Sequence, residues 1–294
     1  MITELKASKL MEVKLTGLFG YPVEHSLSPV MHNTAFKELG LDYLYLPFAV
    51  PKAKLAEAVA GIKGLNFEGV NLTIPHKQKV RDYLDELSQE AELIGAVNTV
   101  QRCNGKLIGH NTDGKGFLRS LVEEASFTPQ DKKVLVIGAG GAARAVSYQL
   151  ALEEVKELYI ANRTLSKAEN LATEVGKKLD LNKAEALPLE KGALSSIIKN
   201  LDLVVDTTPI GMSPQVEVEP VIEAELLHSN LLVADLVYNP VKTTLLKAAQ
   251  KAGAETLSGL GMLVYQGAIA FEIWTGQRAP VKVMKEVVQA AITE

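Results

Sequence analysis

Two short segments in the first 115 residues carry side chains whose types and spacing suit proton-transfer chemistry. In the segment 71–77, alternating polar side chains read as one face of a strand, Pro75 ends the strand ladder, and Lys77 follows. The segment 111–113 repeats the two-residue spacing at the end of another strand and closes on Asp113. Because strand ends meet at one edge of an open α/β sheet, the sequence predicts that an amine and a carboxylate come together there.

Lys77 and Asp113 could together complete a hydride-transfer reaction. Reduction of a carbonyl by hydride leaves a developing alkoxide, which a Lys77 ammonium can protonate; neutral Lys77 would take the proton back in the reverse direction. Asp113 would orient the amine and favour its charged form. The alternative is a structural ion pair, because most lysine and aspartate residues perform no chemistry.

A glycine-rich turn after the apolar strand 134–137 predicts a dinucleotide site. Gly138 would form the turn, and Gly140 would let the backbone approach a pyrophosphate. The helix that follows would offer free N–H groups and the positive end of its dipole to the phosphates. The alternative is an empty Rossmann-like domain. The predicted loop residues are Gly138, Ala139, Gly140, Gly141 and Ala142.

The end of the next strand favours NADP over NAD. An NAD site usually carries an acid there for the ribose 2′-hydroxyl, and the segment 158–164 has none. Arg163 offers a planar fork for a 2′-phosphate, and Asn162, Thr164 and Lys167 add further donors. The alternative is that Thr164 only caps the following helix while Arg163 is a solvated surface residue.

A third segment, Glu24 to Asn33, joins two hydroxyls to a helix start. Ser28 before Pro29 predicts an N-cap followed by proline at the first helical position. With Ser26 beside it, the same helix start is also a good seat for a carboxylate, and both roles can coexist.

Composition limits the class of protein. The 294 residues are 47% apolar and 22% charged, which is typical of a globular chain long enough for two domains. A net charge of −4 gives no case for nucleic acid or an anionic membrane. No apolar run approaches the roughly 20 residues that a membrane span needs. The single cysteine, Cys103, fits a reducing cytosol, so we expect a cytoplasmic protein and treat the first dozen residues as a ragged extension.

The histidines do not predict a metal site. The five histidines show no close ligand spacing, and hydride transfer from a nicotinamide needs no metal. We expect His76 to be structural and His25 and His32 to hydrogen-bond around the first loop.

Alternating strand and helix patterns predict an α/β fold with two mostly parallel sheets. Residues 1–112 form the first expected domain, which contains an Asn-Gly hairpin near residue 104. Residues 113–258 form a Rossmann-like domain. Two last helices, 260–275 and 281–293, are expected to return to the first domain, so that 259–294 completes it. The other predicted strands are 15–19, 43–50, 69–73, 97–102, 106–110, 134–137, 157–161, 202–206, 231–236 and 255–257, and the other predicted helices are 29–39, 54–62, stretches through 93, and 113–126.

Several unrelated motifs, in this order, resemble those of the shikimate dehydrogenase family. They run over nearly the whole chain, from about Leu15 to Ile292, as SLSPVMHN, GVNLTIPHK, GAVNTV, GHNTDG, GAGGAAR, ANRT and GMLVYQGA. The resemblance implies reduction of 3-dehydroshikimate with NADPH. Separately, we expect a monomer or homodimer.

The resemblance also implies roles for individual residues. Ser26 and Ser28 would hold the substrate carboxylate with Tyr238 as a further donor. The residues implied around the substrate hydroxyls are Thr73, Lys77, Asn98, Asp113 and Gln266. Near the cofactor the resemblance implies Thr208, Gly261 and Met262, the last against the nicotinamide.

One position departs from the family, and two other functions stay open. Asp206 stands where the family often has Asn, near the expected ribose and nicotinamide. Within enzymes, the alternative is an NAD-using quinate or quinate/shikimate dehydrogenase, which an acid at 163 or 164 would have favoured. The other alternative is a catalytically silent metabolite sensor, against which the presence of both Lys77 and Asp113 argues.

Overall fold

The computed structural model describes residues 12–293, in two compact units. The first unit comprises Met1–Thr112 with Gly267–Glu294, and the second comprises Asp113–Gln266. The predicted N-terminal extension lies outside the described residues, apart from Glu12. Within residues 12–293, no helix combines the length and apolar character needed to cross a bilayer.

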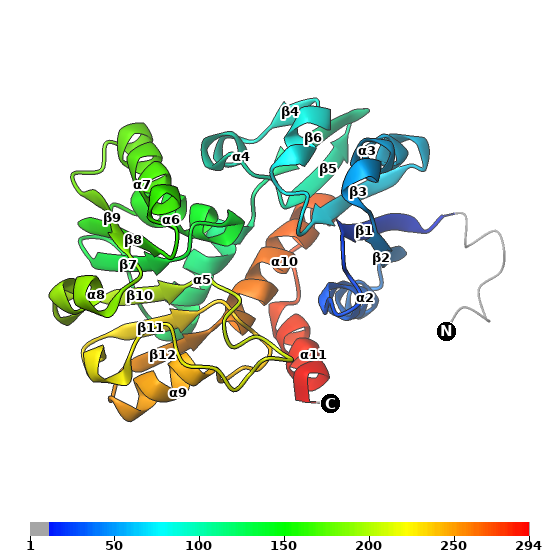
Figure 1. Cartoon of the computed structure of the whole chain (residues 1–294). Helices are drawn as coiled ribbons and strands as arrows, with labels where there is room; N and C mark the ends of the chain where they lie inside the picture. The colour runs from blue at the N-terminus through cyan, green and yellow to red at the C-terminus, as the bar shows by residue number, and fades with distance from the viewer. Residues whose placement is uncertain (1–11, 294) are drawn as a thin grey trace. The chain divides into compact units, whose positions relative to one another are not determined.

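The first unit is built on a six-stranded mixed sheet in the order β2-β1-β3-β5-β6-β4 (Figure 1). The neighbours β2, β1 and β3 are parallel, whereas β5 runs antiparallel to β3 and β6. The strands are β1 (Lys14–Gly20), β2 (Tyr43–Ala49), β3 (Phe67–Leu72), β4 (Glu86–Leu87), β5 (Thr99–Cys103) and β6 (Lys106–His110). The β5–β6 turn is Asn104-Gly105, and both residues have positive φ, so the Asn-Gly hairpin prediction is confirmed.

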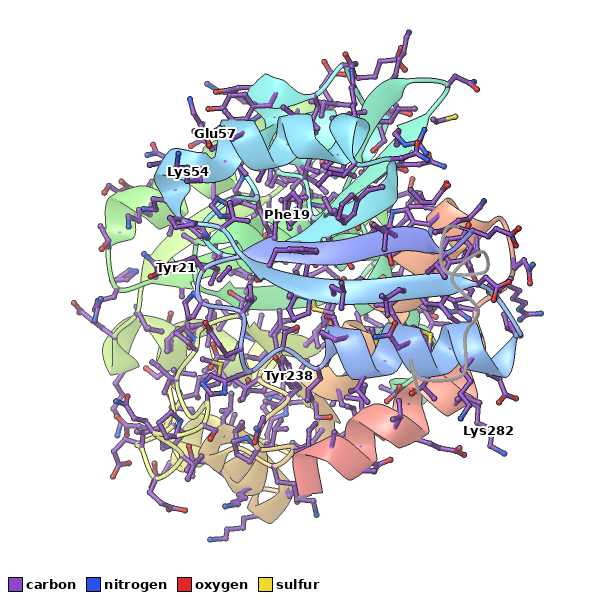
Figure 2. All side chains as sticks on the ribbon, turned by 90° about the vertical axis from the view of Figure 1, so that its right-hand side faces the viewer. Phe19, Tyr21, Lys54, Glu57, Tyr238 and Lys282 are labelled. Atoms are coloured by element: carbon purple, nitrogen blue, oxygen red, sulfur yellow. The ribbon has the colours of Figure 1, made fainter. Side chains whose placement is uncertain are left out.

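Helices cover the first sheet and close its core. The helices are α2 (Ser28–Glu38), α3 (Leu55–Gly64), α4 (Gln89–Ile94) and α11 (Val281–Thr293), with 3₁₀ turns η1 (Lys52–Lys54) and η2 (Lys79–Tyr83). Phe19 points from β1 toward α3, where it belongs to a buried cluster with Val59 and Ile62 (Figure 2). Helix α11 packs beside α2, as predicted for the returning C-terminal segment (Figure 1).

The second unit contains a fully parallel sheet in the order β12-β11-β10-β7-β8-β9. Counted from β7, this is the strand order of a Rossmann fold, so the predicted fold class is confirmed. The strands are β7 (Lys133–Ile137), β8 (Glu157–Asn162), β9 (Ala184–Pro188), β10 (Leu203–Asp206), β11 (Leu232–Asp235) and β12 (Glu255–Ser258). The helices are α5 (Asp113–Ala125), α6 (Gly141–Leu152), α7 (Leu165–Leu179), α8 (Lys191–Ile197) and α9 (Thr244–Lys251), with 3₁₀ turns η3 (Ile198–Asn200) and η4 (Ala224–Leu226).

Alternate residues of these strands bury opposite faces of the sheet. Leu135 and Ile137 of β7 join α8 and α9 in one core cluster, while Val134 and Val136 are fully buried on the other face. Helix α10 (Gly259–Thr275) begins in the second unit and ends in the first.

Two strands were missed in the sequence. The segment predicted as helical through Leu93 contains the two-residue strand β4, which is too short to show periodicity. The strand β9 lies at the edge of its sheet and is only partly buried, so its pattern lacks the apolar run of the central strands.

Candidate active site

Backbone ladders bring three predicted substrate residues to one edge of the first sheet. The Thr73 N–H donates to the Phe19 carbonyl at 3.0 Å, so β3 ends beside the end of β1. The Val97 N–H donates to the Lys77 carbonyl at 2.7 Å, which places Lys77 beside the residue before Asn98. Thr73, Lys77 and Asn98 therefore share the edge from which the Ser26–Ser28 loop also leaves β1.

The Ser28 hydroxyl does not cap helix α2, and that part of the interpretation is wrong. Leu27 occupies the N-cap position, and no side chain caps the helix. The Ser28 N–H instead donates to Ser26 Oγ at 3.3 Å. Ser28 is the first residue of α2 and is buried.

The Asn98 carboxamide is fixed by a buried threonine. Asn98 Oδ1 accepts the Thr112 N–H at 2.8 Å, and Asn98 Nδ2 donates to Thr112 Oγ1 at 2.8 Å. Both residues are almost fully buried. Thr112 directly precedes Asp113, so these two hydrogen bonds hold the backbone immediately before Asp113 in place.

Asp113, Tyr238 and Gln266 belong to the second unit. Asp113 is the buried first residue of α5. Tyr238 follows β11, and burial raises the pKa of its hydroxyl. Gln266 Nε2 donates to the Leu263 carbonyl at 2.8 Å within α10.

The histidines have structural surroundings. His76 Nε2 lies 2.7 Å from the Val50 carbonyl, which ties the segment after β3 to the end of β2. The predicted hydrogen bonding of His32 around the first loop is wrong: within residues 12–293 neither of its ring nitrogens has a hydrogen-bond partner, and the fully buried ring stacks on the Tyr45 ring instead. In the same residues, no group of three or more His, Cys, Asp or Glu could hold a metal ion.

The glycine-rich turn has the geometry of a dinucleotide cradle. Gly138 has φ +111°, and a Cβ there would collide with the Thr207 hydroxyl. Around Gly140 and Gly141 a Cβ would meet no atom within 4 Å, so this stretch of backbone faces open space. Helix α6 starts at Gly141 without a side-chain cap, so its first N–H groups remain for a ligand. The residues present therefore fit a pyrophosphate.

The predicted 2′-phosphate residues follow β8 on the neighbouring strand. Arg163, Thr164 and Lys167 are all exposed. Asn162 Nδ2 donates to the Thr164 carbonyl at 2.9 Å and shapes the turn. Thr164 occupies the N-cap position of α7, but its side chain makes no capping hydrogen bond. The alternative that Thr164 only caps this helix is therefore wrong.

Thr208 is held by Asp206, the residue that departs from the family. The Thr208 N–H donates to Asp206 Oδ1 at 2.8 Å. Burial and the neighbouring Asp235 raise the pKa of Asp206 to about 7. Asp235 and Thr207 were missed among the sequence candidates, although β10 and β11 each end an apolar run with Asp, which is a readable signal.

Gly261 has a packing reason for lacking a side chain. A Cβ there would collide with Ser120 and Glu124 of α5, so α10 approaches α5 closely at this point. Met262, the next residue, is half-buried.

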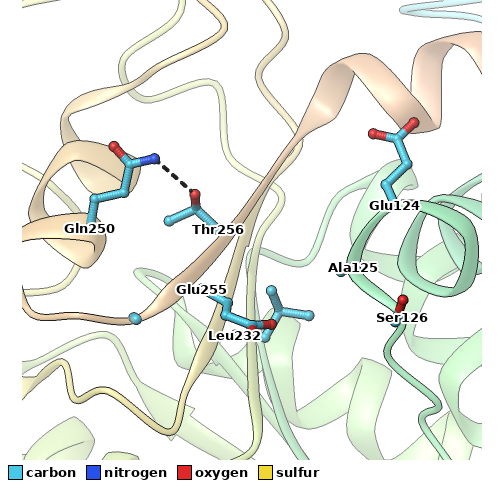
Figure 3. Close-up of a pocket in the computed structure, with 8 residues that line it drawn as sticks. Glu124, Ala125, Ser126, Leu232, Gln250, Glu255 and Thr256 are labelled. Carbon is cyan, nitrogen blue, oxygen red and sulfur yellow. Dashed lines mark hydrogen bonds between the residues drawn. The ribbon is translucent and has the colours of Figure 1, made fainter.

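One surface hollow of the second unit lies away from these residues. Figure 3 shows it beside the starts of β11 and β12, whereas the Gly138 turn follows the end of the parallel strand β7. Gln250 Nε2 donates to Thr256 Oγ1 at 3.1 Å in its wall. The hollow is lined by Glu124, Ala125, Ser126, Leu232, Gln250, Ala254, Glu255 and Thr256.

Three family models match the chain in sequence order. The shikimate dehydrogenase substrate-binding domain matches residues 18–100, shikimate/quinate 5-dehydrogenase matches 120–238, and the shikimate 5′-dehydrogenase C-terminal domain matches 259–289. Among curated relatives, the shikimate dehydrogenase (NADP⁺) of Methanopyrus kandleri is 54% identical over 277 residues, covering 94% of this chain and 95% of that protein.

Solved structures agree with the sequence comparisons. A shikimate dehydrogenase crystallised with NADP⁺ is 46% identical, covers 97% of both chains and has a TM-score of 0.91. Shikimate 5-dehydrogenase of Listeria monocytogenes, crystallised with shikimate and NAD, is 40% identical, covers 98% of this chain and 99% of that chain, and has a TM-score of 0.90. The predicted family is thereby confirmed: the chain belongs to the shikimate dehydrogenase family.

Proposed function

We propose that the chain catalyses the reversible, NADPH-dependent reduction of 3-dehydroshikimate to shikimate. The observation that carries this proposal is the edge of the first sheet, where backbone ladders gather the hydroxyl of Thr73, the amine of Lys77 and the amide of Asn98. Donors of these kinds suit a substrate that carries several hydroxyls and a carboxylate. The first unit would bind this substrate, and the second would bind the cofactor.

The substrate carboxylate and hydroxyls have separate partners in this proposal. Ser26 and Ser28 would receive the carboxylate, with Tyr238 as a further donor. Thr73, Asn98 and Gln266 would bind hydroxyls. Because Thr112 fixes the Asn98 carboxamide, this donor is already oriented before substrate arrives.

Lys77 would transfer the proton that the reaction requires. The bound cofactor supplies a hydride, and the alkoxide that develops at the reduced carbon needs a proton. The Lys77 ammonium would donate that proton, and Asp113 would orient the amine. When shikimate is oxidised, neutral Lys77 would accept the proton from the substrate hydroxyl, and Asp113 would again orient the amine.

NADP is the proposed cofactor. The turn 138–142 would receive the pyrophosphate, and Arg163 with Asn162, Thr164 and Lys167 would receive the 2′-phosphate. No acid stands at the end of β8 to bind a ribose 2′-hydroxyl instead. Thr208, Gly261 and Met262 complete the proposed cofactor contacts.

The alternative is use of NAD or of quinate. One relative above was crystallised with NAD, and a quinate dehydrogenase of Corynebacterium glutamicum is 33% identical, with a TM-score of 0.87. Absorbance at the NADPH band, followed with shikimate or quinate and with NADP⁺ or NAD⁺, separates the four pairings. We expect kcat/KM to be highest for shikimate with NADP⁺, and a higher value for any other pair would contradict the proposal.

We also propose that the protein works in the cytoplasm as a monomer or homodimer. The single cysteine, Cys103, is free and half-buried, which suits a reducing compartment. Light scattering of the purified chain would measure its mass in solution.

A further inference from the structure

One buried carboxylate holds both ends of the loop that carries Tyr238. This loop, 236–243, joins β11 to α9 (Figure 1). Asp235 is the last residue of β11, and its Oδ1 accepts the Val237 N–H at 2.9 Å, one residue before Tyr238. Its Oδ2 accepts the Thr243 hydroxyl at 2.6 Å, at the far end of the loop. The side chain of Asp235 therefore joins the start of the loop to its end.

Thr243 also fixes the point where the loop ends and α9 begins. It occupies the N-cap position of α9, and its hydroxyl oxygen accepts the Leu246 N–H at 3.3 Å. The same hydroxyl thus donates to Asp235 and accepts from the helix. Asp235 and Thr243 are each 1% exposed. Because both groups are shielded from water and one is a carboxylate, their hydrogen bond is of the strong, charge-assisted kind.

Backbone hydrogen bonds hold the residues on either side of Tyr238. The Gly259 N–H donates to the Val237 carbonyl at 3.2 Å, and the Ser213 N–H donates to the Asn239 carbonyl at 2.9 Å. All of these residues belong to the second unit. The backbone around Tyr238 is therefore fixed within that unit, between the two loop ends that the buried carboxylate joins.

We propose that Asp235 is a positioning residue for the substrate carboxylate and acts through Thr243 and the loop that carries Tyr238. This inference rests on the proposed function, in which the Tyr238 hydroxyl donates to that carboxylate. A donor on a fixed loop binds an anion without first losing conformational freedom, so the link between Asp235 and Thr243 strengthens binding without either side chain touching the substrate. The carboxylate is the same in substrate and product, so this contribution affects KM rather than kcat.

The test is Thr243→Val, which removes the hydroxyl at nearly constant volume and so breaks the link to Asp235. We expect KM for shikimate to rise roughly three- to tenfold, the effect of one lost hydrogen bond, with kcat and KM for NADP⁺ changed less than about twofold. Thr243→Ser keeps a hydroxyl at this position and should have the wild-type KM. A Thr243→Ser variant as impaired as Thr243→Val would show that the hydroxyl is not what matters, and would overturn the inference.

Thr256→Val is the matched control. Thr256 lies in the same unit, and its hydroxyl accepts from Gln250 Nε2 at 3.1 Å in the wall of the surface hollow (Figure 3). That hollow lies beside the start of β11, whereas the loop 236–243 follows the end of β11. The control removes a hydrogen-bonded threonine hydroxyl far from the loop and should leave KM for shikimate unchanged. A rise equal to that of Thr243→Val would overturn the inference.

A double-mutant cycle separates the positioning of Tyr238 from a general structural role. In a Tyr238→Phe background the hydroxyl that the loop presents is gone, so Thr243→Val should change KM for shikimate less than about twofold. A structural role would give the same fold-change in both backgrounds. A full effect in the Tyr238→Phe background would therefore contradict the inference.

The remaining outcomes also decide. A folded Thr243→Val enzyme with wild-type KM for shikimate overturns the inference and leaves the proposed function intact. A Tyr238→Phe enzyme with wild-type KM overturns the inference together with that one contact of the proposed function. A wild-type enzyme that does not oxidise shikimate overturns both. If Thr243→Val fails to fold, Thr243→Gly takes its place, because glycine is tolerated at an N-cap and also lacks the hydroxyl; an unchanged KM for that variant overturns the inference.

Discussion

Asp206 and Asp235 occupy paired positions at the ends of the neighbouring parallel strands β10 and β11. Each side chain is 1% exposed. Paired residues on adjacent strands point to the same face about 5 Å apart, so the two carboxyl groups share one low-dielectric space. Asp206 accepts the Thr208 N–H, whereas Asp235 accepts the Val237 N–H and the Thr243 hydroxyl. With more donors, Asp235 is the better site for the charge, and Asp206 is the residue that holds a proton below about pH 7.

The raised pKa of Asp206 predicts that the contribution of this residue to the free energy of unfolding falls between about pH 4 and pH 7. Asp206 ionises near pH 4 when unfolded, and its pKa in the folded protein is about 7. Between those values the folded state binds one more proton than the unfolded state, so the free energy of unfolding falls as pH rises and levels off above pH 7. Asp206→Asn keeps an oxygen for the Thr208 N–H and removes this loss. Its Tm advantage over wild type should therefore grow from pH 4 to pH 7 and then stay constant.

The exposed residue Asp131 provides the control. It has φ +61°, a conformation that Asn also adopts, and it lies in the same unit. Asp131→Asn should shift Tm by a similar amount at every pH. A pH-independent difference for Asp206→Asn would show that the folded protein does not hold a proton on Asp206.

Arg163 should determine the preference for NADP. Arg163→Ala removes a charge-assisted contact made only to the 2′-phosphate, so affinity for NADPH should fall by roughly 1.5 to 3 kcal/mol while affinity for NADH changes little. Cofactor titrations by fluorescence measure both. The control Lys177→Ala removes an exposed cation from the last turn of α7 and should affect neither cofactor. Equal losses of affinity for NADPH and NADH would show that Arg163 supports the fold rather than binding the 2′-phosphate.

Two glycines of the cofactor turn should have different roles: Gly138 should be needed for stability and Gly140 for NADPH binding. Gly138→Ala forces an L-residue to φ +111° and places a Cβ against the Thr207 hydroxyl, so Tm should drop and unfolding should cost about 1–3 kcal/mol less. At Gly140, φ is −85° and a Cβ meets open space, so Gly140→Ala should keep its Tm. The same Cβ would stand where the pyrophosphate approaches, so NADPH affinity should drop. A stable Gly140→Ala variant with full NADPH affinity would place the pyrophosphate elsewhere.

The fold and the main motifs could be predicted from the sequence, because each strand, turn and helix is indicated by residues that are close together in the chain. For example, the apolar run 134–137 and the glycines after it predict a strand, a turn and a helix within ten residues. Tyr45 could not be recognised in the same way. Its strand reads as ordinary core, and the partner of its hydroxyl, Asn71, is 26 positions away in the chain and meets it only after the sheet forms. The Ser28 cap was predicted wrongly because α2 begins one residue earlier than the Ser-Pro pattern indicates, with Leu27 at the N-cap position.

Lys77 should carry proton transfer more than binding. Its ammonium would meet charge that is present only in the transition state, whereas the hydroxyl of Ser26 would meet a carboxylate that the reaction leaves unchanged. Lys77→Ala should therefore lower kcat by on the order of a hundredfold or more, with a smaller change in KM. Ser26→Ala should mainly raise KM.

The neighbouring lysine provides the comparison for this prediction. Lys79 is exposed and its amine contacts Asp82 at 2.7 Å, so Lys79→Ala removes a similar charge two residues away and should leave kcat unchanged. Steady-state kinetics in the direction of shikimate oxidation, with both substrates varied, measures kcat and KM for all three variants. If Lys77→Ala kept its kcat and lost only affinity, Lys77 would be a binding residue. The proton would then need another carrier, and a water molecule held by Asp113 would be the next candidate to examine, through the kcat of Asp113→Asn.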